Sequence, residues 1–152
     1  MPRTIISDTS CLIILSKIGE LELLEKVYGQ ITTTVEIAQE FGEKLPDWIE
    51  IVHVKDILRQ QLLEMQIDKG ESSAIALALE ISESTLILDD YKARKVAEKL
   101  GLSFTGTIGV IIKAKLSGKI ESIKPIILKI KETDFRISTE LEKQALIEAK
   151  EL

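Results

Sequence analysis

The sequence predicts an α/β protein built on a central parallel sheet, and three observations carry this prediction. Short runs of β-branched and apolar residues alternate with longer segments whose apolar residues recur every three or four positions. Neighbouring parallel strands need a crossover, and a helix between them supplies it. The 152 residues amount to one domain's worth of chain. We therefore expect a single domain, residues 1–152, with a core that needs no disulfide.

Five short segments have the composition of strands, and nine have the periodicity of helices. The predicted strands are Thr4–Ser7, Gln30–Thr33, Ile49–Val54, Thr85–Leu88 and Leu102–Phe104. The predicted helices are Cys11–Ile18, Leu21–Tyr28, Val35–Phe41, Ile57–Met65, Glu71–Ile81, Lys92–Leu100, Ile108–Leu116, Ile123–Lys131 and Thr139–Ala149. Ligands of such sheets gather outside the carboxyl ends of the strands, which indicates where to look for chemistry.

The composition excludes several classes of protein. Cys11 is the only cysteine and His53, in a predicted strand, the only histidine, so neither a disulfide framework nor a nitrogen–sulfur zinc site is expected. A single histidine in a predicted strand is also poorly suited to a serine–histidine–aspartate triad. The first twenty residues lack the features of a signal peptide, and no run is long enough to span a membrane, so we expect a cytoplasmic protein.

Acidic residues follow two of the predicted strands. Asp8 comes directly after the first strand, and Asp89 and Asp90 come directly after the fourth, each time before a helix. Glu71 opens a later helix, and Glu40 lies near the end of the third. Carboxylates gathered at one edge repel unless a cation stands between them, and Mg²⁺ or Mn²⁺ prefers such oxygen ligands. The pattern therefore predicts a metal-dependent phosphoryl-transfer site.

Each acid also has an ordinary structural explanation. Asp8 and either Asp89 or Asp90 are favoured residues for capping a helix N-terminus. The helix dipole favours Glu71 in a first turn, whatever its function, and Glu40 fits a solvated helix face. The two strand ends together favour a site more than any one position does, because both reach the edge where ligands bind.

Five motifs in order resemble the PIN domain, in particular the VapC-like branch related to toxin ribonucleases. They are Ile6–Ile13, Val35–Phe41, Asp68–Ala78, Leu88–Ala97 and Thr105–Thr107, and the resemblance extends from Thr4 to Ser138. It implies a three-layer α/β/α fold with a central parallel sheet and the activity of a Mg²⁺- or Mn²⁺-dependent endoribonuclease that acts as the toxin of a type II toxin–antitoxin pair. An RNA substrate, a homodimer and a short antitoxin protein are the implied partners.

The resemblance also assigns roles to the acidic residues. Asp8, Glu40 and Glu71 match the first three acidic positions of the family, and Asp89 with Asp90 matches the last, with the choice between the two left open. Asp8, Glu71 and Asp89 are the implied metal ligands. Thr9, Ser10 and Thr107 are implied hydrogen-bonding partners of metal-bound water. Family members often have aspartate at the position of Glu71 and a proline before the second acid, where this chain has Thr33-Thr34-Val35.

The net charge of −5 argues at first against a polyanionic substrate, but the charge is uneven. Residues 1–90 carry a net −10, residues 91–131 a net +8, and residues 132–152 a net −3. The basic block follows directly on the last acidic position, so its side chains are candidates for contacts with RNA phosphates. The candidates are Lys92, Arg94, Lys95, Lys113 and Lys115, with Lys99 and Lys119 nearby.

Two other functions stay open. The first is a PIN-like scaffold whose acids do not bind metal and which acts by binding a protein. The second is an Asp-based phosphohydrolase or receiver-like phosphoacceptor that uses Asp8 and the Asp89-Asp90 pair, although the sequence shows no lysine-bearing strand to complete such a site.

Overall fold

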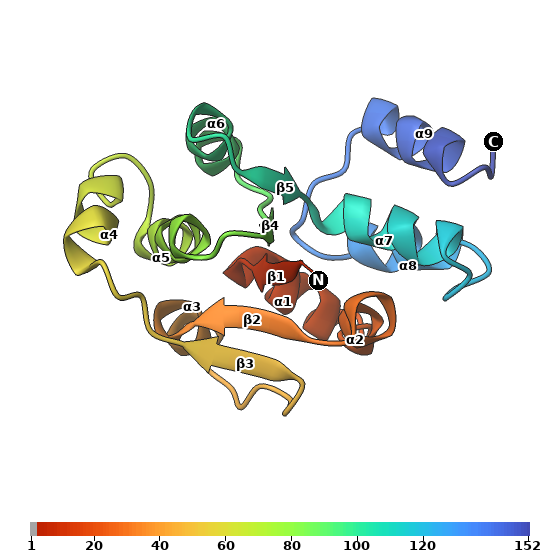
Figure 1. Cartoon of the computed structure of the whole chain (residues 1–152). Helices are drawn as coiled ribbons and strands as arrows, with labels where there is room; N and C mark the ends of the chain where they lie inside the picture. The colour runs from red at the N-terminus through yellow and green to blue at the C-terminus, as the bar shows by residue number, and fades with distance from the viewer. Residues whose placement is uncertain (1–2) are drawn as a thin grey trace.

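The computed structural model describes residues 3–152 and contains one parallel sheet of five strands in the order β3-β2-β1-β4-β5 (Figure 1). The strands are β1 (Thr4–Ser7), β2 (Ile31–Thr34), β3 (Ile49–Val52), β4 (Ser84–Ile87) and β5 (Ser103–Thr105). All neighbours are parallel, with Ile6 opposite both Thr32 and Leu86 in the centre of the sheet. The predicted α/β class and its five strands are confirmed, with ends shifted by at most two residues.

The strand predicted to run through His53 is too long. β3 ends at Val52, and His53 lies in the loop that follows, exposed to solvent. The carboxylate of Glu80 explains the early end, because it accepts hydrogen bonds from the amides of Lys55 and Asp56 at 2.8–3.1 Å. These bonds direct the chain away from the sheet edge and into the next helix.

Nine helices connect and cover the strands among residues 3–152, and each of the nine predicted helical segments is confirmed. They are α1 (Thr9–Lys17), α2 (Glu22–Tyr28), α3 (Val35–Phe41), α4 (Ile57–Leu63), α5 (Lys69–Glu80), α6 (Tyr91–Lys99), α7 (Thr107–Leu116), α8 (Lys124–Lys131) and α9 (Thr139–Glu148). Several begin one or two residues earlier than the apolar periodicity indicates, because a polar side chain caps the first turn.

The helices form a layer on each face of the sheet. Crossovers between parallel strands are right-handed, and those from β1 to β2 to β3 run in the opposite direction to those from β3 to β4 to β5. The helices of the two halves therefore lie on opposite faces, which gives the predicted three-layer α/β/α arrangement. Helix α5, buried along most of its length, packs across β1, β2 and β4. Cys11 is fully buried in the main core, as expected for a small apolar residue.

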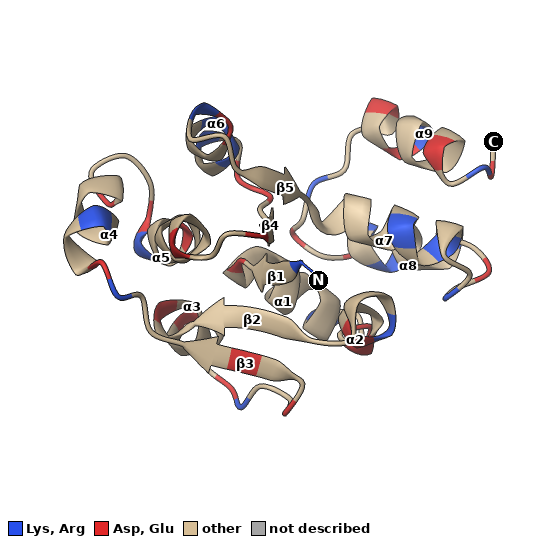
Figure 2. Cartoon of the chain, in the orientation of Figure 1, with Lys and Arg blue, Asp and Glu red and all other residues tan. Residues whose placement is uncertain are grey.

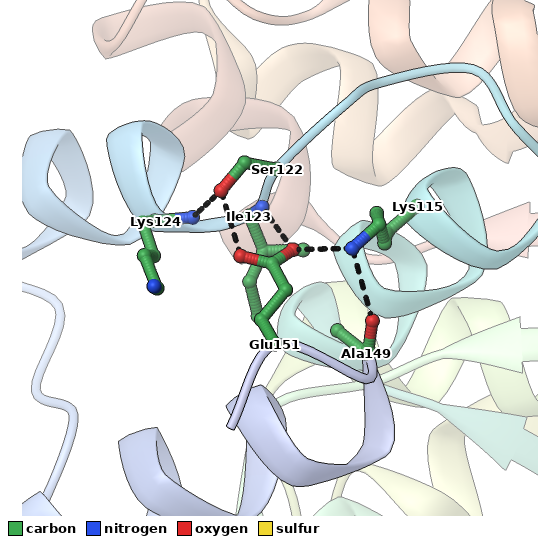
Figure 3. Close-up of polar contacts among 6 residues, drawn as sticks. All are labelled: Lys115, Ser122, Ile123, Lys124, Ala149 and Glu151. Carbon is green, nitrogen blue, oxygen red and sulfur yellow. Dashed lines mark hydrogen bonds and ion pairs between the residues drawn. The ribbon is translucent and has the colours of Figure 1, made fainter.

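The last three helices form a second apolar cluster beside α1 and α2. Helix α9 packs on α7, and a clip at residue Glu151 fastens its end (Figure 3). The Glu151 carboxylate accepts hydrogen bonds from Ser122 Oγ at 2.7 Å and from the Ile123 amide at 2.8 Å. It also pairs with Lys115 Nζ at 3.0 Å, and that ammonium group donates to the Ala149 carbonyl. The clip thus ties the end of α9 to α7 and to the start of α8.

Within residues 3–152, no helix is both long and apolar enough to cross a bilayer.

Candidate active site

Asp8 links the two central strands at the carboxyl edge of the sheet. It follows β1 and caps α1, with Oδ1 accepting from the Cys11 amide at 2.9 Å. Its Oδ2 accepts from the Asp89 amide at 3.0 Å, at the end of β4. The side chain is only 2% exposed. Burial, with the nearby charge of Asp89, raises the pKa of Asp8 to about 7.

The two acids after β4 have different surroundings. The carboxylate of Asp89 turns towards Thr107 and accepts hydrogen bonds from its amide at 2.8 Å and its hydroxyl at 2.6 Å. Asp90 is exposed and caps α6 by accepting from the Ala93 amide at 3.0 Å. Asp89 is therefore joined to Asp8 and to the start of α7, whereas Asp90 lies on the outside of the same turn.

Glu40 reaches this edge from the far end of α3. Its Oε1 accepts a hydrogen bond from Thr9 Oγ1 at 2.5 Å. The carboxylate lies directly against the backbone of Gly70, where a β-carbon would overlap Oε1 and come within 2.9 Å of Cδ. Glycine at position 70 thus leaves room for the Glu40 carboxylate against the start of α5.

Glu71 completes the group of acids that face one pocket. The pocket, of about 300 Å³, is lined by Asp8, Thr9, Ser10, Ile13, Glu40, Asp68 and Glu71. Partial burial and the neighbouring charges of Asp68, Asp90 and Asp8 raise the pKa of Glu71 to about 8. Three of the predicted acids, Asp8, Glu40 and Glu71, therefore lie around one pocket, with Asp89 and Asp90 close by.

Asp68 lines this pocket and was missed as a site residue. It caps α5, with Oδ1 accepting from the Glu71 amide at 3.0 Å. The sequence contained a usable signal, because an aspartate followed three residues later by a glutamate is a capping pattern at a helix start. The cap places the two carboxylates side by side, and their proximity is one cause of the raised pKa of Glu71.

The donor set around the pocket fits a hard divalent cation in type and charge. It consists of carboxylate and hydroxyl oxygens alone. The pKa values of Asp8 and Glu71 are raised first by burial and then by neighbouring carboxylates, and a bound cation would offset both causes. Among residues 3–152, no three Asp, Glu, His or Cys side chains lie close enough together to hold one ion as they stand. One ion could therefore be shared by three of these side chains only if they moved closer to one another.

Lysines of α6 line a groove next to the acidic pocket. The groove, of about 370 Å³, runs between α6 and the segment before Asp68, and it is lined by Gln66, Ile67, Tyr91, Lys92, Lys95, Val96 and Lys99. Lys92 and Lys95 are exposed, and Lys95 Nζ lies 5.3 Å from the centre of the Tyr91 ring. Figure 2 shows this concentration of basic residues on α6. We call the groove the lysine groove.

The basic residues of α7 are not brought to the pocket. Lys113 lies 4.8 Å from the ring centre of Tyr28, which precedes β2 and so belongs to the amino-terminal edge of the sheet. Lys115 is held in the Glu151 clip. The rotation of α7 about its own axis decides the positions of both lysines. A sum of charges along the sequence contains no information about this rotation. Of the candidates for RNA contact, Lys92, Lys95 and Arg94 are the ones near the acids.

A family model described as a PIN domain matches residues 4–151, so this chain belongs to that family. PIN domains are generally nucleases, act on nucleic acid and use divalent metal ions. No curated protein and no solved structure gives a significant match to the chain.

Proposed function

We propose that this PIN domain is a metal-dependent endoribonuclease and the toxin of a type II toxin–antitoxin pair. The observation that supports a phosphodiester substrate most directly is the pocket at the carboxyl edge of the sheet, where four carboxylates, those of Asp8, Glu40, Asp68 and Glu71, face the same space. Two of them have raised pKa values. A surface that concentrates negative charge beside the lysine groove suits a cation that bridges protein and phosphate.

The residues divide the work of the proposed site. Asp8 is rigid, because both of its oxygens accept backbone hydrogen bonds, and it fixes the position of the ligand set. Glu40 and Glu71 come from α3 and α5 and would complete the set. Thr107 holds Asp89 through two hydrogen bonds and so orients its carboxylate. A bound Mg²⁺ or Mn²⁺ would lower the pKa of a water ligand and stabilise charge that develops on the phosphoryl oxygens.

The RNA backbone would approach over α6. Lys92 and Lys95 extend from the helix that starts immediately after Asp90, so phosphates bound there lie next to the acidic pocket. Contacts of this kind position the chain of the nucleic acid and carry no sequence information by themselves. We therefore propose that affinity comes from the backbone and the shape of the RNA.

The decisive experiment compares two identical substitutions at helix caps. Asp8→Asn changes the proposed ligand that caps α1, and Asp56→Asn changes the residue that caps α4 outside the pocket. With Mn²⁺ and a structured RNA, we expect the unaltered chain and Asp56→Asn to cleave and Asp8→Asn to be inactive. Undiminished cleavage by Asp8→Asn would exclude Asp8 as a metal ligand and with it the proposed site.

The toxin role adds partners that can be tested separately. We propose a homodimer and a short antitoxin protein, on the basis of the resemblance to the VapC-like branch. Light scattering of the purified chain measures the dimer, and a mass that stays at 17.0 kDa would contradict it. Co-expression with a short protein encoded beside this gene should suppress both cleavage and growth arrest if that protein is the antitoxin.

One observation favours a second candidate, a PIN-like scaffold that binds a protein without metal. No three potential ligands in residues 3–152 already converge on one point. Calorimetric titration with Mn²⁺ at neutral pH separates the two functions, because the scaffold predicts no binding. The phosphoacceptor alternative gains no support, because no lysine is among the described residues that line the pocket containing Asp8.

A further inference from the structure

A second groove opens on the other side of Asp89, between the start of α7 and the face of α9. It has a volume of about 400 Å³. Its lining combines two arginines, Arg94 and Arg136, two phenylalanines, Phe104 and Phe135, and two acids, Asp89 and Glu148, the last of them on α9. We call it the arginine groove. Figure 1 shows α9 beside α7, the two helices whose residues line this groove, and the groove shares Asp89 with the proposed active site.

Arg94 is held in place at the inner end of this groove. Its Nε donates to the Leu88 carbonyl at 2.6 Å, and its guanidinium lies 5.5 Å from the centre of the Phe104 ring. Nη2 rests on the backbone of Gly106, where a β-carbon would overlap it and lie 3.0 Å from Asp89 Oδ1. Glycine at position 106 therefore lets a fixed guanidinium stand next to a proposed metal ligand.

The guanidinium of Arg94 keeps donors available for a ligand. Within residues 3–152, its only hydrogen bond is the one made by Nε, so both Nη groups remain free to donate. A fixed planar guanidinium with free N–H groups suits the oxygens of a phosphate better than a mobile lysine does. Because it is already ordered, little side-chain entropy is lost when a ligand binds.

The rest of the groove has the character of a nucleoside site. Its floor is apolar, with Ile108, Ile112 and Ala145 buried and the partly buried ring of Phe135 at one side. A volume of about 400 Å³ lies in the range of small-molecule sites. Arg136 is exposed beside Phe135 and makes no hydrogen bond or ion pair in the described part of the chain.

We propose that the arginine groove binds one nucleotide of the RNA substrate, next to the phosphodiester that is cut. Its phosphate lies between Arg94 and Arg136, and its base lies on the apolar floor against Phe135. This inference rests on the proposed nuclease function and adds a second contact region to it. RNA would then cross the acidic pocket from the lysine groove on one side to the arginine groove on the other.

The test measures nucleotide binding without divalent metal, so that cleavage plays no part. Adenosine 5′-monophosphate and uridine 5′-monophosphate are each titrated into the full chain, and the chemical shifts of backbone amides are followed by NMR. We expect the largest shifts at Gly106 and Gly109, which line the groove. Adenosine and inorganic phosphate, used as separate probes, should each bind at least tenfold more weakly than the monophosphate, because each engages only part of the site.

A pair of charge reversals shows whether Arg136 contributes. Arg136→Glu changes the groove, whereas Lys143→Glu changes an exposed position on α9 outside the lining. Both variants alter the net charge by the same amount. We expect Arg136→Glu to weaken monophosphate binding about tenfold and Lys143→Glu to weaken it less than twofold. Both positions are exposed, so neither change should affect folding.

Several results would overturn the nucleotide site. They are the absence of binding, shifts confined to the acidic pocket, equal effects of the two charge reversals, and phosphate alone binding as tightly as the monophosphate. Cleavage is measured separately with Mn²⁺. Intact cleavage without monophosphate binding would reject the nucleotide site and leave the proposed nuclease function standing. Intact monophosphate binding without cleavage in any assay would reject the nuclease function instead.

Discussion

Gly70 is a single residue on which the proposed active site depends. Alanine there would displace the Glu40 carboxylate from Thr9, since the new β-carbon would lie only 2.1 Å from Oε1. The obstacle is the end of a flexible side chain, and alanine favours a helix by up to about 1 kcal/mol over glycine. Gly70→Ala should therefore leave the free energy of unfolding unchanged or slightly higher while lowering Mn²⁺ affinity and cleavage about tenfold. Calorimetry and thermal unfolding measure the two effects, and equal losses of stability and activity would contradict this account.

Thr107 is a second residue whose effect can be isolated. Its hydroxyl and its amide both donate to Asp89, and only the hydroxyl is removed in Thr107→Val. We expect this variant to cleave at least tenfold more slowly, because Asp89 loses a charge-assisted hydrogen bond worth about 1.5–3 kcal/mol. Thr107→Ser keeps the hydroxyl and should retain most of the activity. Similar activity in the valine and serine variants would show that the hydroxyl does not position Asp89.

Glu71 predicts how stability depends on pH in the metal-free protein. Its pKa is about 8 in the folded chain, against 4.5 ordinarily, so between these values the folded chain keeps a proton that the unfolded chain has released. Stability must then fall as the pH rises from about 4.5 to 8. Glu71→Gln removes this loss of stability, so it should raise the free energy of unfolding at pH 8 and leave it unchanged at pH 4. We expect a gain of about 1 kcal/mol at pH 8, less than the full pKa difference implies, because the side chain is partly exposed to solvent.

Urea unfolding at pH 4 and pH 8 measures the effect of Glu71. Glu43→Gln serves as a control, since Glu43 is exposed and outside the pocket. Added Mn²⁺ should stabilise the unaltered chain at pH 8 by mass action and the Glu71→Gln chain much less. A Glu71→Gln chain that is less stable than the unaltered chain at pH 8 would be inconsistent with a raised pKa.

At the scale of elements, the sequence was sufficient for every strand and helix but not for how their ends are fixed. Periodicity locates the helices, yet it places the start of α5 at Glu71, whereas the cap at Asp68 starts the helix at Lys69. The acids after β1 and β4 were predictable, because a parallel sheet brings strand ends to one edge. Their hydrogen bonds were not, since Asp8 accepts from Asp89 across 81 positions of sequence.

The attachment of α9 is the least local feature of the fold and gives a prediction about an element. The clip joins Lys115 of α7 to Glu151 beyond α9, and Glu151 is only 7% exposed. Hydrogen bonds from Ser122, Ile123 and Lys115 lower the pKa of Glu151 to about 2 despite its burial. A depressed carboxyl pKa contributes stability that is complete above about pH 4.5 and is lost as the pH falls towards 2.

Breaking the clip should therefore loosen α9 at neutral pH and have little effect near pH 2. We expect Glu151→Gln to cost about 1–2 kcal/mol at pH 7 and to increase amide exchange in α9 and in the first turn of α8. Lys115→Met with Glu151→Gln forms a double-mutant cycle that measures the coupling of the pair. Additive effects of the two substitutions, or exchange that rises equally in α5, would argue against a clip specific to α9.

At the scale of the whole molecule, the arrangement of charge matters more than its sum. A net charge of −5 repels a polyanion on average, but four of the acids line one pocket, and three lysines and two arginines line the two grooves beside it. The division along the sequence at residue 90 anticipated this arrangement. It could not distinguish α6, whose lysines lie near the pocket, from α7, whose lysines lie elsewhere, because that depends on helix rotation and packing.

The lysines of the lysine groove should control how RNA binding depends on salt, whereas the net charge of the molecule should not. Each phosphate contact with single-stranded RNA contributes about 0.7 to the slope of log affinity against log salt concentration. If Lys92 and Lys95 each contact one phosphate, Lys92→Glu with Lys95→Glu should reduce that slope by about 1.4. Lys119→Glu with Lys124→Glu makes the same change in net charge at exposed positions outside both grooves and should leave the slope nearly unchanged. Fluorescence anisotropy without divalent metal, over roughly 50–200 mM salt, measures the slope. An equal reduction of the slope in the two double variants would mean that RNA binding depends on net charge alone and that the RNA does not contact α6.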